Sequence, residues 1–231
     1  MRPVEKGPAP RSYTDYRDAA NDLVQRLGRY CNYCEKNLDN APEVEHIQPK
    51  SSNPNLKLEW TNFLLACKNC NGIKSNKPVN LAQVAFPHTD NTFRGLLYKQ
   101  GMVQVDPHLS TKEKGAIASL VKLVGLDRSP GSNKPTVADN RWELRQQYWR
   151  VAEENKRTID KVDQSKQSAS ADELRESAAC IALAGGHFSV WMTVFQDDPK
   201  MKRLLIKKFR GTAKDCFDTN GKPIPRPGGK L

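Results

Sequence analysis

Two pairs of cysteines have the spacing of a metal-binding site. Cys31 and Cys34 form one C-x-x-C motif, and Cys67 and Cys70 form a second one after 32 intervening residues. Each motif can place two thiolates around one ion, and four thiolates complete the closed tetrahedral coordination of a structural Zn²⁺. No coordination position stays open, so this zinc would hold structure and would not catalyse. The alternative, disulfides or redox pairs, is disfavoured in a reducing compartment.

Between the two cysteine pairs, and just after the second pair, lie side chains that could catalyse the hydrolysis of a phosphodiester bond. Glu45 precedes His46, Asn62 follows, and Asn71 comes directly after the last cysteine. A neutral imidazole can take a proton from water, so His46 is the candidate general base. Glu45 and Asn71 offer oxygen ligands to a hard divalent cation, Mg²⁺ or Mn²⁺. Asn62 is expected to orient the His46 loop by hydrogen bonding.

The backbone that carries these residues must meet two conditions. Adjacent side chains on an extended strand face opposite ways, so Glu45 and His46 need a kink or turn at residues 47–49 to serve one site. Asn71 immediately follows a cysteine of the predicted zinc site. The zinc would therefore fix where the helix of Asn71 begins relative to the strands, and a structural ion would order a second, catalytic site.

Basic residues are abundant, as expected for a protein that meets a polyanion. The 231-residue chain has a net charge of +11, and residues 199–231 hold ten Lys or Arg against two Asp, a net charge of +8. Lys74, one helical turn after Asn71, could contact a phosphate next to the scissile one, and Lys50 and Lys77 are further candidates. Exposed lysines on a solvated face are equally common, so charge alone does not establish nucleic-acid binding.

Nothing in the sequence predicts a membrane segment or a signal peptide. No stretch approaches the ~18 apolar residues of a membrane helix, and residues 1–12 have no apolar run. We therefore expect a cytoplasmic protein, whose reduced thiols are available as metal ligands. Outside the two pairs, Cys180 lies among alanines and isoleucine and is expected to be buried, and Cys216 likewise.

Hydrophobic periodicity predicts an α+β, mostly helical chain: a zinc-stapled ββα-metal unit followed by a mainly α-helical C-terminal domain. Residues 31–77 have only short apolar runs, so they need a metal to hold their shape. The predicted domains are a flexible or partner-bound arm at 1–12, a catalytic unit with the zinc site at 13–80, and a helical domain with a basic tail at 81–231. Predicted helices span residues 13–30, 111–125, 140–159, 171–184, 188–195 and 200–209, with a hairpin at 93–105, a linker at 127–135 and a polar break at 163–170.

The combination of Glu45, His46, Asn62 and Asn71 inside two cysteine pairs resembles the HNH nuclease family. The resemblance covers about fifty residues. Glu45 stands where many members have His or Asp, and Asn71 replaces the final His, as in the HNH domains of CRISPR effector nucleases. The resemblance implies a metal-dependent endonuclease that hydrolyses phosphodiester bonds of DNA or RNA.

Segments outside the motif look like the HNH nuclease subunits of bacterial anti-phage systems, the PtuB proteins of Septu and of some retrons. This resemblance implies an effector subunit that works with PtuA, an ABC/SMC-type ATPase. The chain has no G-x-x-x-x-G-K-[ST] motif, so nucleotide hydrolysis would come from that partner. The helical half would be a docking surface, and the basic tail would hold substrate or partner. The segments are residues 1–7, 87–93, 188–192, 209–213 and 216–218.

Two other interpretations fit the same sequence. A zinc-ribbon module could grip nucleic acid without cutting it, and an assembly subunit could retain a vestigial site. The nuclease and the zinc-ribbon module both predict four thiolates and a basic surface. Only the nuclease requires Glu45, His46, Asn62 and Asn71 to act together.

Overall fold

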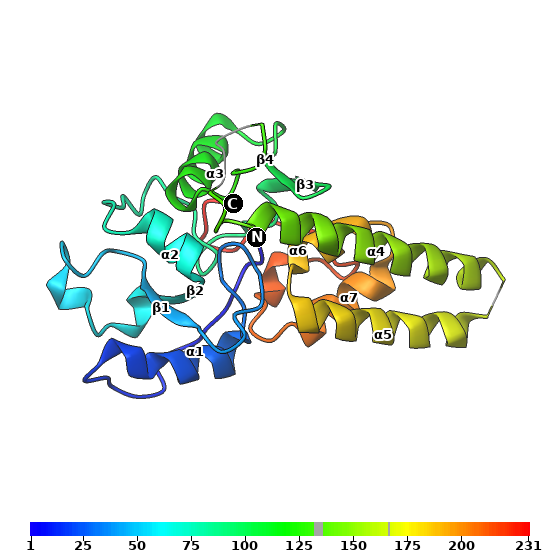
Figure 1. Cartoon of the computed structure of the whole chain (residues 1–231), viewed down its shortest axis with the longest axis horizontal. Helices are drawn as coiled ribbons and strands as arrows, with labels where there is room; N and C mark the ends of the chain where they lie inside the picture. The colour runs from blue at the N-terminus through cyan, green and yellow to red at the C-terminus, as the bar shows by residue number, and fades with distance from the viewer. Residues whose placement is uncertain (132–135, 166) are drawn as a thin grey trace.

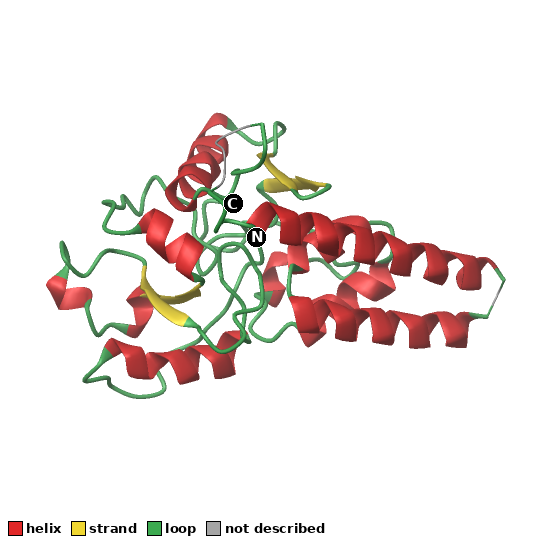
Figure 2. Cartoon of the chain, in the orientation of Figure 1, coloured by secondary structure: helices red, strands yellow, loops and turns green. Residues whose placement is uncertain are grey.

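The computed structural model describes residues 1–131, 136–165 and 167–231. The remaining residues, 132–135 and 166, belong to the predicted linker and polar break, which thus lie partly outside the described residues. Figures 1 and 2 show short strands and helices at the N-terminal end and a long helical hairpin that projects away from them. The predicted fold class, α+β and mostly helical, is confirmed.

Two strands and a helix form the unit that contains the cysteine pairs. Strand β1 (Glu43–His46) pairs antiparallel with β2 (Phe63–Ala66), all four residues of which are buried. Cys67 follows directly and begins helix α2 (Lys68–Lys74), because its sulfur accepts a hydrogen bond from the backbone N–H of Cys70 at 3.4 Å. One cysteine therefore ends the strand, caps the helix and supplies a thiol.

Helix α1 covers this hairpin. The expected helix at 13–30 is shorter: a 3-10 turn, η1 (Tyr16–Asp18), leads into α1 (Ala19–Leu27). Gly28 ends the helix with a φ of 75°, which glycine adopts without steric cost. Leu23 and Leu27 are fully buried, so α1 packs its apolar face against β1 and β2.

The middle of the chain follows its local signals closely. Strands β3 (Leu96–Lys99) and β4 (Met102–Val105) form the predicted hairpin, and Gly101 has a φ of 86° in its turn. Helix α3 (Thr111–Val124) begins at Ser110, which makes a reciprocal capping box with the third residue of the helix. This helix packs against α2 and the hairpin.

The C-terminal half is an assembly of helices. Helices α4 and α5 lie side by side over their length, and α6 and α7 pack against them (Figure 1). Arg175 on α5 pairs with Asp163 on α4 and with Asp198, which caps α7. The helices are α4 (Arg141–Gln164), α5 (Ser168–Gly185), α6 (Phe188–Val194) and α7 (Pro199–Lys208), and the further 3-10 turns are η2 (Pro54–Leu56), η3 (Trp60–Asn62) and η4 (Lys214–Cys216).

The buried side chains form two hydrophobic clusters. The first contains the cysteine unit, α1, the β3–β4 hairpin and α3, and so extends from residue 1 to beyond residue 120. The second lies among the helices from α4 to α7 and the residues that follow them. The predicted domain division after residue 80 stays a prediction, and the first cluster includes side chains on both sides of it.

The first residues do not form the expected arm. Met1, Arg2, Val4 and Lys6 are buried, and Val4 makes a β-bridge with Thr212. Arg2 donates to the backbone carbonyl of Leu27 at 2.6 Å, at the end of α1. Short runs of prolines and charges look flexible in a sequence, but here buried carbonyls accept from the cations, which explains the difference.

The two remaining cysteines differ in burial. Cys216 is buried, as expected, but the expectation that Cys180 is buried is wrong, because its side chain is exposed on α5. Ala178, Ala179 and Ala182 occupy the buried stripe of that helix. The apolar neighbours of Cys180 in the sequence suggest burial. The position of Cys180 around the helix axis instead turns its side chain toward solvent.

Among the described residues, no helix is both long and apolar enough to cross a membrane.

Gly185 is needed where α4 and α5 meet. A Cβ atom at this position would lie 2.0 Å from Cζ of Tyr148 on α4. We expect Gly185→Ala to force the helices apart and to destabilise the protein by about 1–3 kcal/mol, measured as a lower midpoint of thermal unfolding.

The matched control is Gly115→Ala in α3, where an added Cβ meets no atom within 4 Å. This change should raise stability by roughly 0.5–1 kcal/mol, since alanine favours a helix interior over glycine. Equal effects of the two substitutions would contradict the packing argument.

Candidate active site and zinc centre

The four paired cysteines lie together in the structure. One ligand atom from each of Cys31, Cys34, Cys67 and Cys70 can be chosen so that all lie within 4.8 Å of one another, and all four residues are buried. A tetrahedral Zn²⁺ with bonds of about 2.3 Å places its sulfurs about 3.8 Å apart. The Sγ atoms of Cys34 and Cys67 are 3.7 Å apart, so the residues fit zinc. The cluster predicted from the sequence is confirmed.

Hydrogen bonds tie the first cysteine pair to the sheet. The backbone N–H of Asn32 donates to the carbonyl of Leu65 at 2.8 Å, and the side-chain oxygen of Asn32 accepts from the N–H of Leu65 at 2.7 Å. Leu65 lies on β2, immediately before the second pair. The two cysteine loops therefore approach each other through the strand as well as through the sulfurs.

A buried arginine from the helical half contacts the sulfur cluster. Nη1 of Arg141 lies 3.1 Å from Sγ of Cys70 and donates to the carbonyl of Val124, while Nη2 donates to that of Gly125. Asp139 binds the same guanidinium through both carboxylate oxygens, at 2.6 and 2.7 Å. Four thiolates around Zn²⁺ carry a net negative charge, so a guanidinium at one sulfur lowers the cost of burying them.

The proposed base, His46, ends strand β1 and is 7% exposed. Its Nε2 lies 2.9 Å from the carbonyl oxygen of Lys57. Because a carbonyl can only accept, Nε2 carries the proton and Nδ1 of the neutral ring is the acceptor. Burial lowers the pKa of His46 below its usual 6.5, so the neutral form prevails at pH 7.

Asn62 holds the loop that follows His46. Its Oδ1 accepts from the N–H of Gln48 at 2.8 Å, and its Nδ2 donates to the carbonyls of Gln48 and Leu56. The backbone carbonyl of Asn62 also accepts from the N–H of Ile47. The chain bends at residues 47–48, within the predicted turn. These hydrogen bonds are of the kind expected for Asn62.

Glu45 is paired with a buried lysine from α2. Nζ of Lys74 lies 2.6 Å from Oε1 of Glu45 and donates to the backbone carbonyl of His46 at 2.7 Å. Lys74 is 0% exposed, so the expectation that it contacts a substrate phosphate is not met by this structure. Desolvation outweighs the favourable charge of Lys74 and raises the pKa of Glu45 to about 7.

Asn71 is oriented by a carboxylate that the sequence did not single out. Its Nδ2 donates to Oε2 of Glu43 at 2.8 Å. Glu43 and Glu45 are two residues apart on β1 and share a face, while Asn71 and Lys74 share a face of α2. The strand and helix therefore meet through two matched polar pairs. Because Nδ2 is engaged, the amide oxygen of Asn71 is the atom left for a cation.

One small pocket brings the candidate residues together. Glu45, His46 and Asn71 line a cavity of about 160 Å³, and the exposed Lys50 lies at its edge. The carboxyl and amide oxygens fit a hard cation such as Mg²⁺. Lys77 is also exposed, but its side chain lies 3.5 Å from the carbonyl of Leu123 and does not line this pocket.

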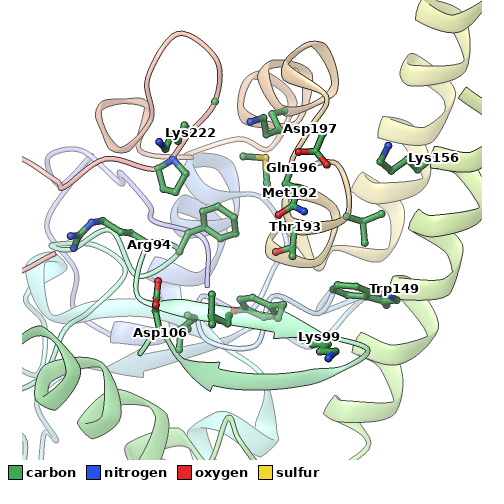
Figure 3. Close-up of a pocket in the computed structure, with 18 of the residues that line it drawn as sticks. Arg94, Lys99, Asp106, Trp149, Lys156, Met192, Thr193, Gln196, Asp197 and Lys222 are labelled. Atoms are coloured by element: carbon green, nitrogen blue, oxygen red, sulfur yellow. The ribbon is translucent and has the colours of Figure 1, made fainter. Parts of the chain in front are cut away.

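A larger cavity, of about 980 Å³, lies elsewhere. It is bounded by the β3–β4 hairpin, α4 and the region of α6 (Figure 3). Basic side chains such as Lys99 and Lys156 alternate there with acidic ones such as Asp106 and Asp197. No candidate catalytic residue lines it, so it is separate from the chemistry described above.

Sequence reasoning missed Arg141, Glu43 and Lys6. Lys6 donates through Nζ to the carbonyls of Trp60, Thr61 and Phe63, at 2.6, 3.0 and 2.6 Å, and so holds the turn that contains Asn62. Arg141 and Lys6 are far from their partners in the sequence, and no local signal marks them. Glu43 could have been found from its i, i+2 spacing to Glu45.

A family comparison matches the same segment. The family described as HNH endonuclease matches residues 31–77, which contain both cysteine pairs and the pocket residues. This segment is an HNH endonuclease domain. The HNH domain comprises 47 of the 231 residues, about a fifth of the chain.

A curated relative extends the comparison. Over 71 residues, this chain is 38% identical to Septu protein PtuB of Bacillus thuringiensis. The alignment covers 29% of this chain and 28% of the relative, so it spans less than a third of either protein. No solved structure matches the chain.

The sulfur cluster should determine the metal content of the HNH domain. We expect one zinc per chain in the purified wild type and loss of that zinc in Cys34→Ser, with marked destabilisation because residues 31–77 lose their central link. Metal analysis and thermal unfolding measure the two effects.

Cys180→Ser is the matched control, since its thiol is exposed and lies outside the cluster. This variant should bind one zinc per chain and should unfold at the midpoint temperature of the wild type. Retention of full zinc by Cys34→Ser would contradict the four-sulfur site.

Proposed function

We propose that this chain is a metal-dependent endonuclease that hydrolyses phosphodiester bonds in DNA or RNA. The observation that carries the proposal is the placement of His46 with Glu45 and Asn71 in one pocket of an HNH domain. A binding module without cleavage would have no need to keep an imidazole neutral beside two oxygen ligands.

His46 is the general base of the proposed reaction. The Lys57 carbonyl holds its Nε2–H, so Nδ1 would take a proton from the attacking water. The lowered pKa keeps Nδ1 free of a proton at neutral pH. Ring contacts fix the plane of the imidazole, with Tyr16 and Phe63 at centroid distances of 4.8 and 5.2 Å.

Glu45 and Asn71 would hold the divalent cation, Mg²⁺ or Mn²⁺. Such an ion supplies charge stabilisation to the phosphate and to the leaving oxygen. Asn71 is kept in place by its hydrogen bond to Glu43, and Glu45 is kept in place by its ion pair with Lys74. Lys74 thus acts as a positioning residue under the site, while Lys50 and Lys77 remain exposed candidates for contact with nucleic acid.

The protein is further proposed to be the effector of a bacterial anti-phage complex in the cytoplasm. The likeness to a Septu PtuB protein supports a defence role. The absence of a phosphate-binding G-x-x-x-x-G-K-[ST] motif supports a separate PtuA-like ABC/SMC-type ATPase as partner. Four reduced thiols in one cluster fit a reducing compartment.

His46→Ala should remove cleavage of nucleic acid by at least 10²-fold, because general-base catalysis contributes about 10²–10⁴-fold. Cleavage of labelled DNA and RNA in Mg²⁺ or Mn²⁺, by the chain alone and with its co-purified partner, is the measurement. Zinc content should not change, and the protein should remain folded.

His108→Ala is the control, since its side chain is 88% exposed and pairs with the nearby Asp106. It should cut at the wild-type rate. A wild type that binds nucleic acid under all these conditions but never cuts would contradict the proposal.

Cleavage should fall as the pH is lowered through about 7, with a midpoint that depends on Mg²⁺. Glu45 has a pKa of about 7 and binds the cation only when ionised, so protons and Mg²⁺ compete for it. Tenfold more Mg²⁺ should move the midpoint down by up to about one pH unit, as linkage requires. The pKa of His46 lies below 6.5, so this residue is not expected to set a midpoint near pH 7. A midpoint that does not shift with Mg²⁺ would show that a group other than Glu45 causes the loss of cleavage.

A further inference from the structure

A second cavity adjoins the pocket of His46. Its volume is about 490 Å³, within the range of sites that hold small molecules. Tyr16 and Lys50 line both cavities, as does Asn76, so the two lie next to each other. We call the larger one the Tyr16 cavity. Tyr16, which lines this cavity, packs against the imidazole of His46.

The Tyr16 cavity is positively charged. Arg17, Lys50 and Lys57 line it, against one acidic residue, Asp15. The carboxylate of Asp15 accepts from the backbone N–H of Arg17 at 2.9 Å and lies 3.7 Å from its guanidinium. Asp15 is thus already engaged by its own turn, and no carboxylate is paired with Lys50 or Lys57 among the described residues. The cavity therefore favours an anion.

Tyr16 places one of these cations. Nζ of Lys50 donates to the hydroxyl of Tyr16 at 2.9 Å and lies 4.0 Å from the centre of its ring. The same ring packs edge-on against His46, with centroids 4.8 Å apart. The ammonium of Lys50 is therefore held at a fixed position relative to the imidazole, with less side-chain freedom to lose when an anion binds.

Lys57 links the two cavities through its backbone. Its carbonyl accepts from Nε2 of His46, while its side chain lines the Tyr16 cavity. One residue therefore both orients the proposed base and contributes charge to the neighbouring space.

We propose that the Tyr16 cavity is a subsite for the nucleotide next to the scissile phosphate, whose backbone phosphate is bound by Arg17, Lys50 and Lys57. Tyr16 is a positioning residue that acts through Lys50. This subsite rests on the proposed nuclease function and defines its substrate as a nucleic-acid strand that continues past the cutting site.

The test uses the full chain with His46→Ala, so that bound nucleic acid is not cut. Binding of short fluorescent single-stranded DNA and RNA is measured by anisotropy over a series of salt concentrations. Arg17→Ala, Lys50→Ala and Lys57→Ala, each added to this background, should weaken binding. Each should also reduce the slope of log affinity against log salt, and the three changes combined should reduce it by about 0.7, the value for one phosphate contact on a single strand.

Lys161→Ala is the matched control. Lys161 is an exposed lysine in the last turn of α4, which extends away from β1 (Figure 1). Its removal changes the net charge equally but should leave the slope unchanged. Tyr16→Phe should weaken binding in the presence of Lys50 and have no further effect in Lys50→Ala, because the hydroxyl acts through that ammonium.

The outcomes separate the subsite from the function. Unchanged slopes in all three cation variants, or slopes that fall equally in Lys161→Ala, overturn the subsite, and cleavage by the wild type would leave the nuclease proposal standing. Reduced slopes together with a wild type that never cuts support the subsite and overturn cleavage. Failure of the His46→Ala protein to bind either strand overturns the subsite.

Discussion

The gathering of four cysteine sulfurs within 4.8 Å fixes the position of nearly every residue in the candidate site. Residues 31–77 contain only two short strands and a helix of seven residues, which could not hold this shape by apolar burial alone. The sulfurs join the loop before β1 to the start of α2. As a result, the acidic face of the strand meets Asn71 and Lys74 on α2.

Buried basic side chains hold other parts of the site in place through hydrogen bonds and ion pairs. Lys74 balances Glu45, Arg141 balances the sulfur cluster, and Lys6 binds three carbonyls of the turn that leads to Asn62. Each is more than nine-tenths buried, and each has oxygen or sulfur partners within hydrogen-bonding distance. Removal of any one would leave unpaired polar atoms in the interior. The geometry around His46 therefore depends on buried polar partners.

The helical half is joined to the HNH domain by specific polar contacts. Glu35, just after the first cysteine pair, accepts from both the N–H and the hydroxyl of Ser189 on α6. Asn37 donates to the carbonyl of Ala184 at the end of α5, and Arg141 at the start of α4 reaches Cys70. Three helices are thus anchored around the zinc side of the domain, while the Tyr16 side remains open.

The sequence by itself determined the features that depend on spacing within a few residues. The C-x-x-C pairs, the capping box at Ser110, the glycine ends of α1 and α3, and the adjacency of Glu45 to His46 are local, and the structure keeps them. Only the tertiary structure decided which polar side chains lie inside. Lys74 is buried, Cys180 is exposed, and Arg141 contacts a sulfur 71 positions earlier in the chain. The physical reason is that helical phase and distant partners set burial, and neither can be read from a residue's immediate neighbours.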